Sequence, residues 1–245
     1  YFYINFIKET IYIIIMNICK KRIMKDIMDI EKNPIENIFY NTNEDNMEKG
    51  YAMIIGPENT PYENGFYFFE FIFPSNYPFI PPKVYFRTGD NKTRFNPNFY
   101  VNGYVCLSLL NTWPGEQWSS CQSIRSILLN LMIIMNDTPL LNEPGIKMEH
   151  KDFLNYNKII HYRNYEIAFL RSLNLDQLND SYKIFHVHIK EYFLTHYKTI
   201  RDKLEKNTHI ETLQTSIYNL YCVINYNNII KLMDLCYNEL SKIDK

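Results

Sequence analysis

The sequence lacks any Cys-x-x-Cys pair, although it contains five cysteines. They are scattered along the chain, at Cys19, Cys106, Cys121, Cys222 and Cys236. Without paired spacing, neither a zinc ribbon nor a dithiol redox site is encoded. An odd number of scattered cysteines is typical of a reduced intracellular chain. We therefore expect a cytoplasmic protein, with the nucleus as a further compartment open to it.

Charge of one sign and long apolar runs are also absent. The net charge is −1, which gives no reason to expect binding to nucleic acid. Residues 1–18 are apolar in character, but Lys8 and Glu9 interrupt them. The remainder is far shorter than the roughly 20 residues that span a bilayer, and it has neither a charged leader nor a cleavage site. Residues 1–17 are therefore expected to be an apolar lead-in to the first helix, with no membrane contact.

Two kinds of ligand-binding signal are missing. There is no Gly-x-x-x-x-Gly-Lys loop, so no nucleotide site is encoded. His186, His188 and His196 form a loose histidine group, but histidines on a surface helix are far commoner than a metal site with this spacing. The sequence therefore predicts no metal and no other cofactor.

The first predicted helix spans residues 18–32, and Pro34 closes it. Its apolar residues recur at helical spacing: Ile23, Met24, Ile27, Met28 and Ile30. Its outer face carries four cations: Lys20, Lys21, Arg22 and Lys25. A run of cations is most often the solvated side of a helix, and the functional alternative is a docking surface for an acidic partner.

Four short aromatic and β-branched runs follow, at residues 38–40, 51–55, 66–73 and 83–86. Turn residues separate them, which is typical of an antiparallel meander. The segments 56–65 and 74–82 contain prolines that each remove a ladder donor, so they are predicted to be rigid loops. From residue 153 onward the chain is rich in helix-forming residues, and two or three helices are expected there.

The stretch between residues 94 and 144 surrounds a lone cysteine, Cys106, in a Gly-x-Val-Cys-Leu context. Asn98, in the turn Asn96-Pro97-Asn98, precedes it by eight residues, and Glu143 lies beyond the next apolar run. A lone cysteine is usually a small buried hydrophobe. Here the whole stretch resembles the active-site segment of ubiquitin-conjugating enzymes, and this resemblance implies a functional thiol instead.

Taken in order, these segments resemble the ubiquitin-conjugating enzyme family. The motifs that carry the resemblance are Gly56-Pro57, Thr60-Pro61-Tyr62-Glu63, Tyr77-Pro78-Phe79, Pro81-Pro82-Lys83-Val84, Asn96-Pro97-Asn98 and Val105-Cys106-Leu107. The resemblance implies an α+β fold over residues 18–150, with an N-terminal helix, a four-stranded meander, an active-site segment and a central helix. A helical C-terminal extension would occupy residues 151–245. Residues 94–100, 112–118 and 142–145 are most similar to the long, class Z type of the family.

The chemistry that this resemblance implies is covalent catalysis by a thiol. Cys106 would take ubiquitin, or a ubiquitin-like modifier, as a thioester from an activating enzyme and pass it to a lysine amine. Asn98 would stabilise the oxyanion of the tetrahedral intermediate. Glu143 would be an acidic gate residue that helps the amine to lose its proton. A free thiol with a pKa near 8.5 is only a few per cent ionised at neutral pH, which suits exchange between thioesters.

The resemblance also implies partner-binding residues. Lys20, Lys21 and Arg22 would dock the activating enzyme, and Phe79 would contact a ubiquitin ligase that brings the protein substrate. The chain departs from the family pattern at three places: Asn96 replaces a histidine, Ser108 replaces a frequent acidic residue, and residues 119–121 replace Ser-Pro-Ala. The last change argues against ordinary RING-ligase pairing.

Two alternatives remain open on the sequence alone. One is a catalytically inactive binding module that only presents ubiquitin, although such variants usually lack the cysteine that is present here as Cys106. The other keeps the same chemistry but carries a different ubiquitin-like modifier, and no motif decides between modifiers.

Overall fold

The structure is a computed structural model that describes residues 2–207 and 209–242. Its central sheet has four antiparallel strands in the order β1-β2-β3-β4. Their bounds are Ile38–Thr42, Lys49–Ile55, Phe66–Ile72 and Lys83–Phe86. Each strand pairs with its neighbour in sequence. The predicted meander and the predicted α+β fold are therefore confirmed.

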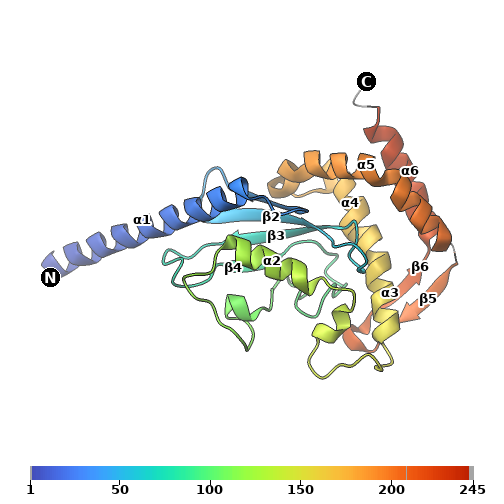
Figure 1. The fold of residues 1–245 in the computed structure, drawn as a ribbon, viewed down its shortest axis with the longest axis horizontal. Coiled ribbons are helices and arrows are strands. Elements are labelled where there is room, and N and C mark those ends of the chain that lie inside the picture. The colour runs from blue at the N-terminus through green and yellow to red at the C-terminus, as the bar shows by residue number, and fades with distance from the viewer. Residues whose placement is uncertain (1, 208, 243–245) are drawn as a thin grey trace.

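The first helix begins earlier than predicted. α1 (Phe2–Lys32) includes the segment expected to be a lead-in, apart from Tyr1, which lies outside the described residues. No glycine or proline occurs between residues 2 and 32, so nothing in the sequence breaks the helix there. Figure 1 shows its first turns projecting beyond the sheet. Ile23 and Ile30 are buried, whereas Met24 and Met28 are about half exposed.

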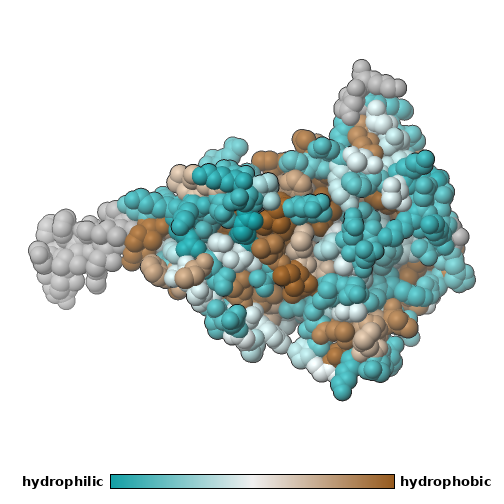
Figure 2. Space-filling model, viewed as in Figure 1, coloured by the Kyte–Doolittle hydropathy of each residue, from teal (hydrophilic) through white to brown (hydrophobic). Residues whose placement is uncertain are grey.

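The central helix α2 (Ile124–Ile134) starts at a capping box in which Ser123 and Ser126 each accept a hydrogen bond from the other's backbone. Its inward stripe at helical spacing is Ile124, Ile127, Leu128 and Leu131. The opposite face leaves Ile133 69% exposed. Figure 2 shows apolar side chains gathering in the middle of this face of the molecule, where Figure 1 places α2 and the sheet. The helix is thus apolar beyond the stripe that its packing requires.

The C-terminal region contains helices, as predicted, and also a β-hairpin that was not predicted. The helices are α3 (Phe153–Arg163), α4 (Leu170–Leu173), α5 (His186–Leu204) and α6 (Tyr226–Leu240), with a π-helical turn at Asn164–Phe169. The hairpin pairs β5 (Glu211–Gln214) with β6 (Tyr221–Ile224). Short 3-10 turns lie at Ser108–Leu110, Pro139–Asn142, Leu175–Gln177, Asp180–Phe185, Glu205–Asn207 and Ile217–Asn219. Four-residue strands are too short for alternation to stand out from helical periodicity, which explains the missed hairpin.

Asn164, on the π-helical turn, joins this region to the sheet. Its side chain is fully buried. It accepts a hydrogen bond from Tyr67 on β3 at 2.6 Å and donates one to the carbonyl of Glu63 at 2.8 Å. Gly65 makes the approach possible, because a Cβ there would lie 1.8 Å from the Asn164 amide oxygen. The C-terminal region therefore packs directly on the sheet, and the buried core is continuous from α1 to α6.

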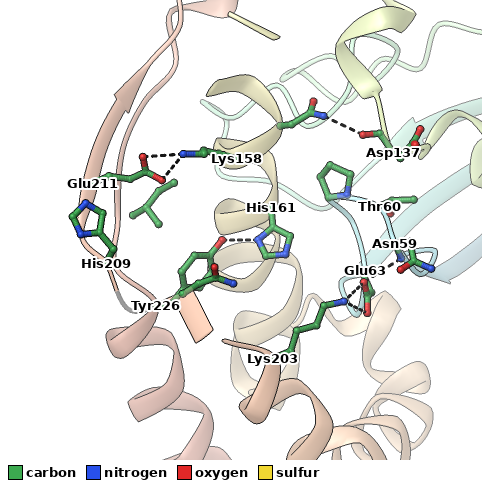
Figure 3. A pocket seen from close by; sticks show the side chains of 14 residues that line it. Asn59, Thr60, Glu63, Asp137, Lys158, His161, Lys203, His209, Glu211 and Tyr226 are labelled. Carbon is green, nitrogen blue, oxygen red and sulfur yellow. Dashed lines mark hydrogen bonds and ion pairs between the residues drawn. The ribbon is translucent and has the colours of Figure 1, made fainter. Parts of the chain in front are cut away.

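A polar cavity of about 520 Å³ lies between the core and the C-terminal region (Figure 3). Lys203 from α5 reaches across it to Glu63 of the core at 2.7 Å, and Lys158 from α3 pairs with Glu211 of β5 at 3.0 Å. Such exposed pairs contribute little to stability individually, about 0–1 kcal/mol. Deeper in the cavity, Nδ1 of His161 and the Tyr226 hydroxyl share a hydrogen bond of 2.5 Å.

His161 is expected to make the fold acid-sensitive. Burial, with the cation of Lys203, lowers its pKa to about 4, from an ordinary value near 6.5. The folded state thus keeps the ring neutral while the unfolded chain takes up a proton below about pH 6.5. The stability that depends on the neutral ring is lost as pH falls from 6.5 towards 4. The shift corresponds to roughly 3 kcal/mol, and partial solvent contact of the half-buried ring reduces this to about 2 kcal/mol.

Thermal unfolding of the wild type and of His161→Gln between pH 7 and pH 4.5 checks this expectation. The difference in Tm between the two should narrow as pH falls, because only the wild type must keep an imidazole neutral. His209→Gln is the matched control, since His209 lines the same cavity but is exposed. A difference in Tm that stays constant with pH for His161→Gln would contradict the expectation.

Candidate active site

The backbone beside the sheet places Cys106 next to Asn98. Val105 forms an isolated bridge with Phe99, and the Cys106 amide donates to the carbonyl of Asn98 at 2.9 Å. Tyr104, two residues earlier, bridges to Tyr85 of β4. The active-site segment is therefore held as an irregular extension of the sheet edge. This explains why two residues eight positions apart in sequence lie side by side.

Thr112 closes the loop that follows the cysteine. Its hydroxyl accepts from the Leu107 amide at 2.8 Å and lies 3.0 Å from the carbonyls of Val105 and Leu107. The Cys106 thiol donates to the Thr112 carbonyl at 3.0 Å, and the Cys106 residue is only 5% exposed. Thr112 is the first of residues 112–118, which resemble the class Z type, but its structural role was not predicted. Reaction with a protein thioester requires release of the thiol from this carbonyl.

The electrostatics of the site disfavour a free thiolate. Burial raises the pKa of the Cys106 thiol, and the Arg94 guanidinium partly opposes this by lowering the pKa. The thiol is thus protonated at neutral pH, even more completely than an ordinary cysteine. This arrangement is unlike that of thiol hydrolases, where a histidine lowers the pKa of the cysteine. It suits exchange between thiols of similar strength.

Asn98 lies beside Cys106 as the sequence predicted. Its side-chain amide donates to the carbonyl of Cys106 itself at 2.6 Å. Its amide oxygen is buried and has no hydrogen-bond partner among the described residues. The structure thus shows Asn98 fixing the loop that carries Cys106. Stabilisation of an oxyanion stays a prediction, and it requires the amide to leave the Cys106 carbonyl.

Asn96 occupies the position where the family usually has histidine. It is fully buried, and its amide donates to the Tyr62 hydroxyl and to the Ile134 carbonyl, both at 2.8 Å. Its oxygen accepts from the backbone of Asn98 at 2.9 Å and from Asn142 at 3.3 Å. One asparagine therefore ties the turn before the cysteine to the end of α2 and to the loop that carries Glu143.

Glu143 follows the 3-10 turn Pro139–Asn142 and is half-buried. Its carboxylate accepts a hydrogen bond from the hydroxyl of Tyr218, in the turn of the β5-β6 hairpin. Among the described residues, no hydrogen bond joins Glu143 to Cys106 or Asn98. The structure brings Cys106 and Asn98 together directly, and it connects Glu143 to them through its neighbour Asn142 and through Asn96. Its role as a gate stays a prediction.

The geometry agrees with a family comparison. A family model described as "Ubiquitin-conjugating enzyme" matches residues 22–163, which include the sheet, the Cys106 segment and α2. This match covers more than half of the chain. The chain belongs to the ubiquitin-conjugating enzyme family.

Curated relatives support the predicted subtype within this family. The chain is 45% identical to ubiquitin-conjugating enzyme E2 Z of Xenopus tropicalis over 155 residues, covering 62% of this chain and 50% of the relative. It is 46% identical to ubiquitin-conjugating enzyme E2 Z of Homo sapiens over 153 residues, covering 61% of this chain and 43% of the relative. The predicted similarity to the Z type is confirmed. The chain spans about half the length of these relatives.

The predicted partner-binding residues of this family member lie on α1 and on the loop between β3 and β4. Lys20 and Lys21 are exposed on α1. Arg22 instead pairs with Asp26 at 2.8 Å and donates to the carbonyls of Ser120 and Gln122. Arg22 thus fastens α1 to the loop before α2. Docking of the activating enzyme by Lys20, Lys21 and Arg22 stays a prediction.

Phe79 is 64% exposed on the loop between β3 and β4. Trp118 holds this loop in place, since its indole N–H donates to the Pro78 carbonyl at 2.7 Å. Ser119, Ser120 and Cys121, which replace the usual Ser-Pro-Ala, are all exposed. The loop thus presents an aromatic side chain to solvent on a rigid base.

The structure shows how the possible metal ligands and the helices are arranged. Within residues 2–207 and 209–242, no three His, Cys, Asp or Glu side chains gather as metal ligands would. His188 stacks on Phe39 at 4.3 Å, and His196 stacks on Tyr192 at 4.1 Å. None of the described helices has the length and apolar character needed to span a bilayer.

Proposed function

We propose that this chain accepts ubiquitin, or a ubiquitin-like modifier, as a thioester on Cys106 and transfers it to a lysine amine. In the first step the Cys106 sulfur attacks the thioester carbonyl on an activating enzyme. A new C–S bond forms, the old one breaks, and the activating enzyme's thiol leaves. In the second step a lysine nitrogen attacks the same carbonyl, an amide forms, and the Cys106 thiol is released. The observation that supports this best is the placement of the Asn98 amide against Cys106, within the region that matches the family.

One observation favours a second candidate, a module that binds a modifier without chemistry. The thiol is nearly inaccessible, its pKa is raised by burial, and it is engaged by the Thr112 carbonyl. A module that only presents the modifier would not need an accessible thiol. The two candidates differ in whether a covalent adduct ever forms.

The deciding experiment incubates the purified chain with ATP, a panel of activating enzymes and tagged modifiers. The products are separated on gels with and without reductant. We expect an adduct with at least one modifier that disappears on reduction, and its identity names the cargo. Binding of a modifier without any adduct, across the whole panel, would support the presenting module instead.

The partner surfaces belong to the same proposal. α1 offers Lys20 and Lys21 beside the exposed Met24 and Met28, a combination of cations and apolar surface suited to an acidic domain of the activating enzyme. Phe79 is proposed as the ligase contact, because a large exposed aromatic side chain on a supported loop is typical of an interface anchor.

Reversing the charge of Lys20 and Lys21 is expected to slow charging. The double variant Lys20→Glu, Lys21→Glu should reduce the association rate with the activating enzyme about tenfold at low salt, and less at physiological salt. Arg22 is left intact because its removal would also loosen α1. The rate of thioester formation at several salt concentrations measures the effect.

Lys198→Glu with Lys231→Glu is the matched control, with the same change of charge on exposed positions of α5 and α6. Equal slowing of the control would mean that only net charge matters. An unchanged rate of thioester formation in the α1 variant would mean that these lysines only form the solvated side of the helix.

A further inference from the structure

The turn of the β5-β6 hairpin reaches the active-site region through one side chain, that of Tyr218. Its hydroxyl donates to the Glu143 carboxylate. The centre of its ring lies 5.0 Å from the Arg94 guanidinium carbon, which also lies 3.5 Å from the centre of the Tyr100 ring. Tyr218 therefore contacts an acid on the loop after α2 and a base in front of the Asn96–Asn98 turn. The hydrogen bond to Glu143 joins residues 75 positions apart in the sequence.

Arg94 carries this contact towards the cysteine. Its guanidinium donates to the Pro97 carbonyl at 2.6 Å and to the Asn96 carbonyl at 3.2 Å. These carbonyls belong to the turn that presents Asn98. The Arg94 backbone is fixed as well, because its carbonyl accepts from the Tyr156 hydroxyl at 2.7 Å. Tyr218 thus packs against the side chain that braces this turn.

The backbone at Tyr218 is held in a conformation that tyrosine seldom adopts. Its φ is 60°, in the left-handed region, and the next residue, Asn219, has φ 50°. Non-glycine residues persist there only when the surroundings fix them, and they gather at functional sites. Here Asp152 fixes the turn, since its carboxylate accepts from the amide and hydroxyl of Ser216 and from the amide of Ile217, at 2.6–2.9 Å.

We propose that Tyr218 is a positioning residue for Glu143 and for the turn that carries Asn98, so that the C-terminal hairpin completes the active site. This inference rests on the proposed function. Without the hydroxyl, the Glu143 carboxylate is free to turn into solvent. With it, the carboxylate keeps one orientation, in which it takes the proton of the incoming lysine.

The hydrogen bond from Tyr218 to Glu143 keeps its proton over the range of a useful test. The charged or titratable side chains that face Tyr218 and Glu143 are Arg94, Tyr62, Tyr100 and Tyr156. Burial, and then the hydrogen bond to Glu143, raise the pKa of Tyr218, so its hydroxyl keeps its proton. Burial also raises the pKa of Tyr62 and of Tyr156. The thiol cannot titrate in the charged enzyme, because it is acylated.

The test measures single-turnover discharge of preformed thioester to free lysine, from pH 7 to pH 10. Tyr218→Phe keeps the ring on Arg94 and removes only the hydroxyl. We expect unchanged charging and about tenfold slower discharge at pH 7, the fold-change that one hydrogen bond to a charged group typically supports. The defect should shrink towards pH 10, where lysine loses its proton without help. Tyr221→Phe is the matched control, a tyrosine of the same hairpin that is 62% exposed.

A double-mutant cycle with Glu143→Gln decides between positioning and mere structural support. If Tyr218 acts through Glu143, discharge by the double variant is no slower than discharge by Glu143→Gln alone. The inference would be overturned if the double variant slowed discharge by the product of the two single effects. It would also be overturned if Tyr218→Phe slowed discharge equally at every pH. Both outcomes would leave the proposed function intact. A wild-type chain that forms no thioester would overturn the proposed function and this inference together.

Discussion

Cys106→Ala is expected to abolish the adduct with the modifier, and Cys106→Ser to replace it with one that survives reductant. The first variant has no nucleophile at position 106. The second forms an oxyester, which thiols do not cleave as readily as a thioester. Charging reactions with both variants, compared on reducing and non-reducing gels, measure the outcome. The expected effect is complete loss of the reductant-sensitive band in both.

Cys121 provides the sharpest control for this assignment. It is an exposed thiol on the loop before α2, whereas Cys106 is buried. On accessibility alone, Cys121 would be the better nucleophile. Cys121→Ala is nevertheless expected to charge like the wild type, because only Cys106 has the Asn98 amide against it. An adduct that is lost with Cys121→Ala and kept with Cys106→Ala would show that the assignment of the nucleophile is wrong.

Asn98→Ala is expected to slow discharge to lysine by about 10²–10³, the usual effect of removing one oxyanion donor. Charging should be largely intact, because a thiolate is a stronger nucleophile than an amine and exchange between thiols needs less stabilisation of the oxyanion. The amide does not titrate, so the defect should be the same from pH 7 to pH 10. This independence of pH separates Asn98 from Glu143 and Tyr218, whose defects should shrink as pH rises.

The structural role of Asn98 must be controlled in the same experiment. The variant loses the 2.6 Å bond to the Cys106 carbonyl, which costs about 1 kcal/mol of stability. Thr112→Val is a suitable comparison, because it also removes loop hydrogen bonds, those of the Thr112 hydroxyl, and leaves the Asn98 amide in place. If Thr112→Val slows discharge as much as Asn98→Ala does, the loop and not the oxyanion donor explains both defects.

The sequence by itself determined the sheet and the nearness of Asn98 to Cys106, and it predicted Cys106 as the nucleophile. The four strand runs are short, turn residues separate them, and their pairing follows chain order, so local signals were sufficient. Cys106 and Asn98 are only eight residues apart, with a turn between them that brings them together. Where the partners of a contact are neighbours in sequence, turn chemistry and alternation already determine the geometry.

The tertiary structure alone decided which predicted residues are free to act. Arg22 reads as a surface cation, yet it is bound to carbonyls about 100 residues away. Glu143 reads as an isolated acid on a loop, yet Tyr218 from an unpredicted hairpin holds it. Asn96 reads as a departure from the family, yet it joins the active-site turn to α2 and to the Glu143 loop. Each of these contacts joins distant segments, and no local propensity encodes them, because they form only when helices and hairpin pack on the sheet.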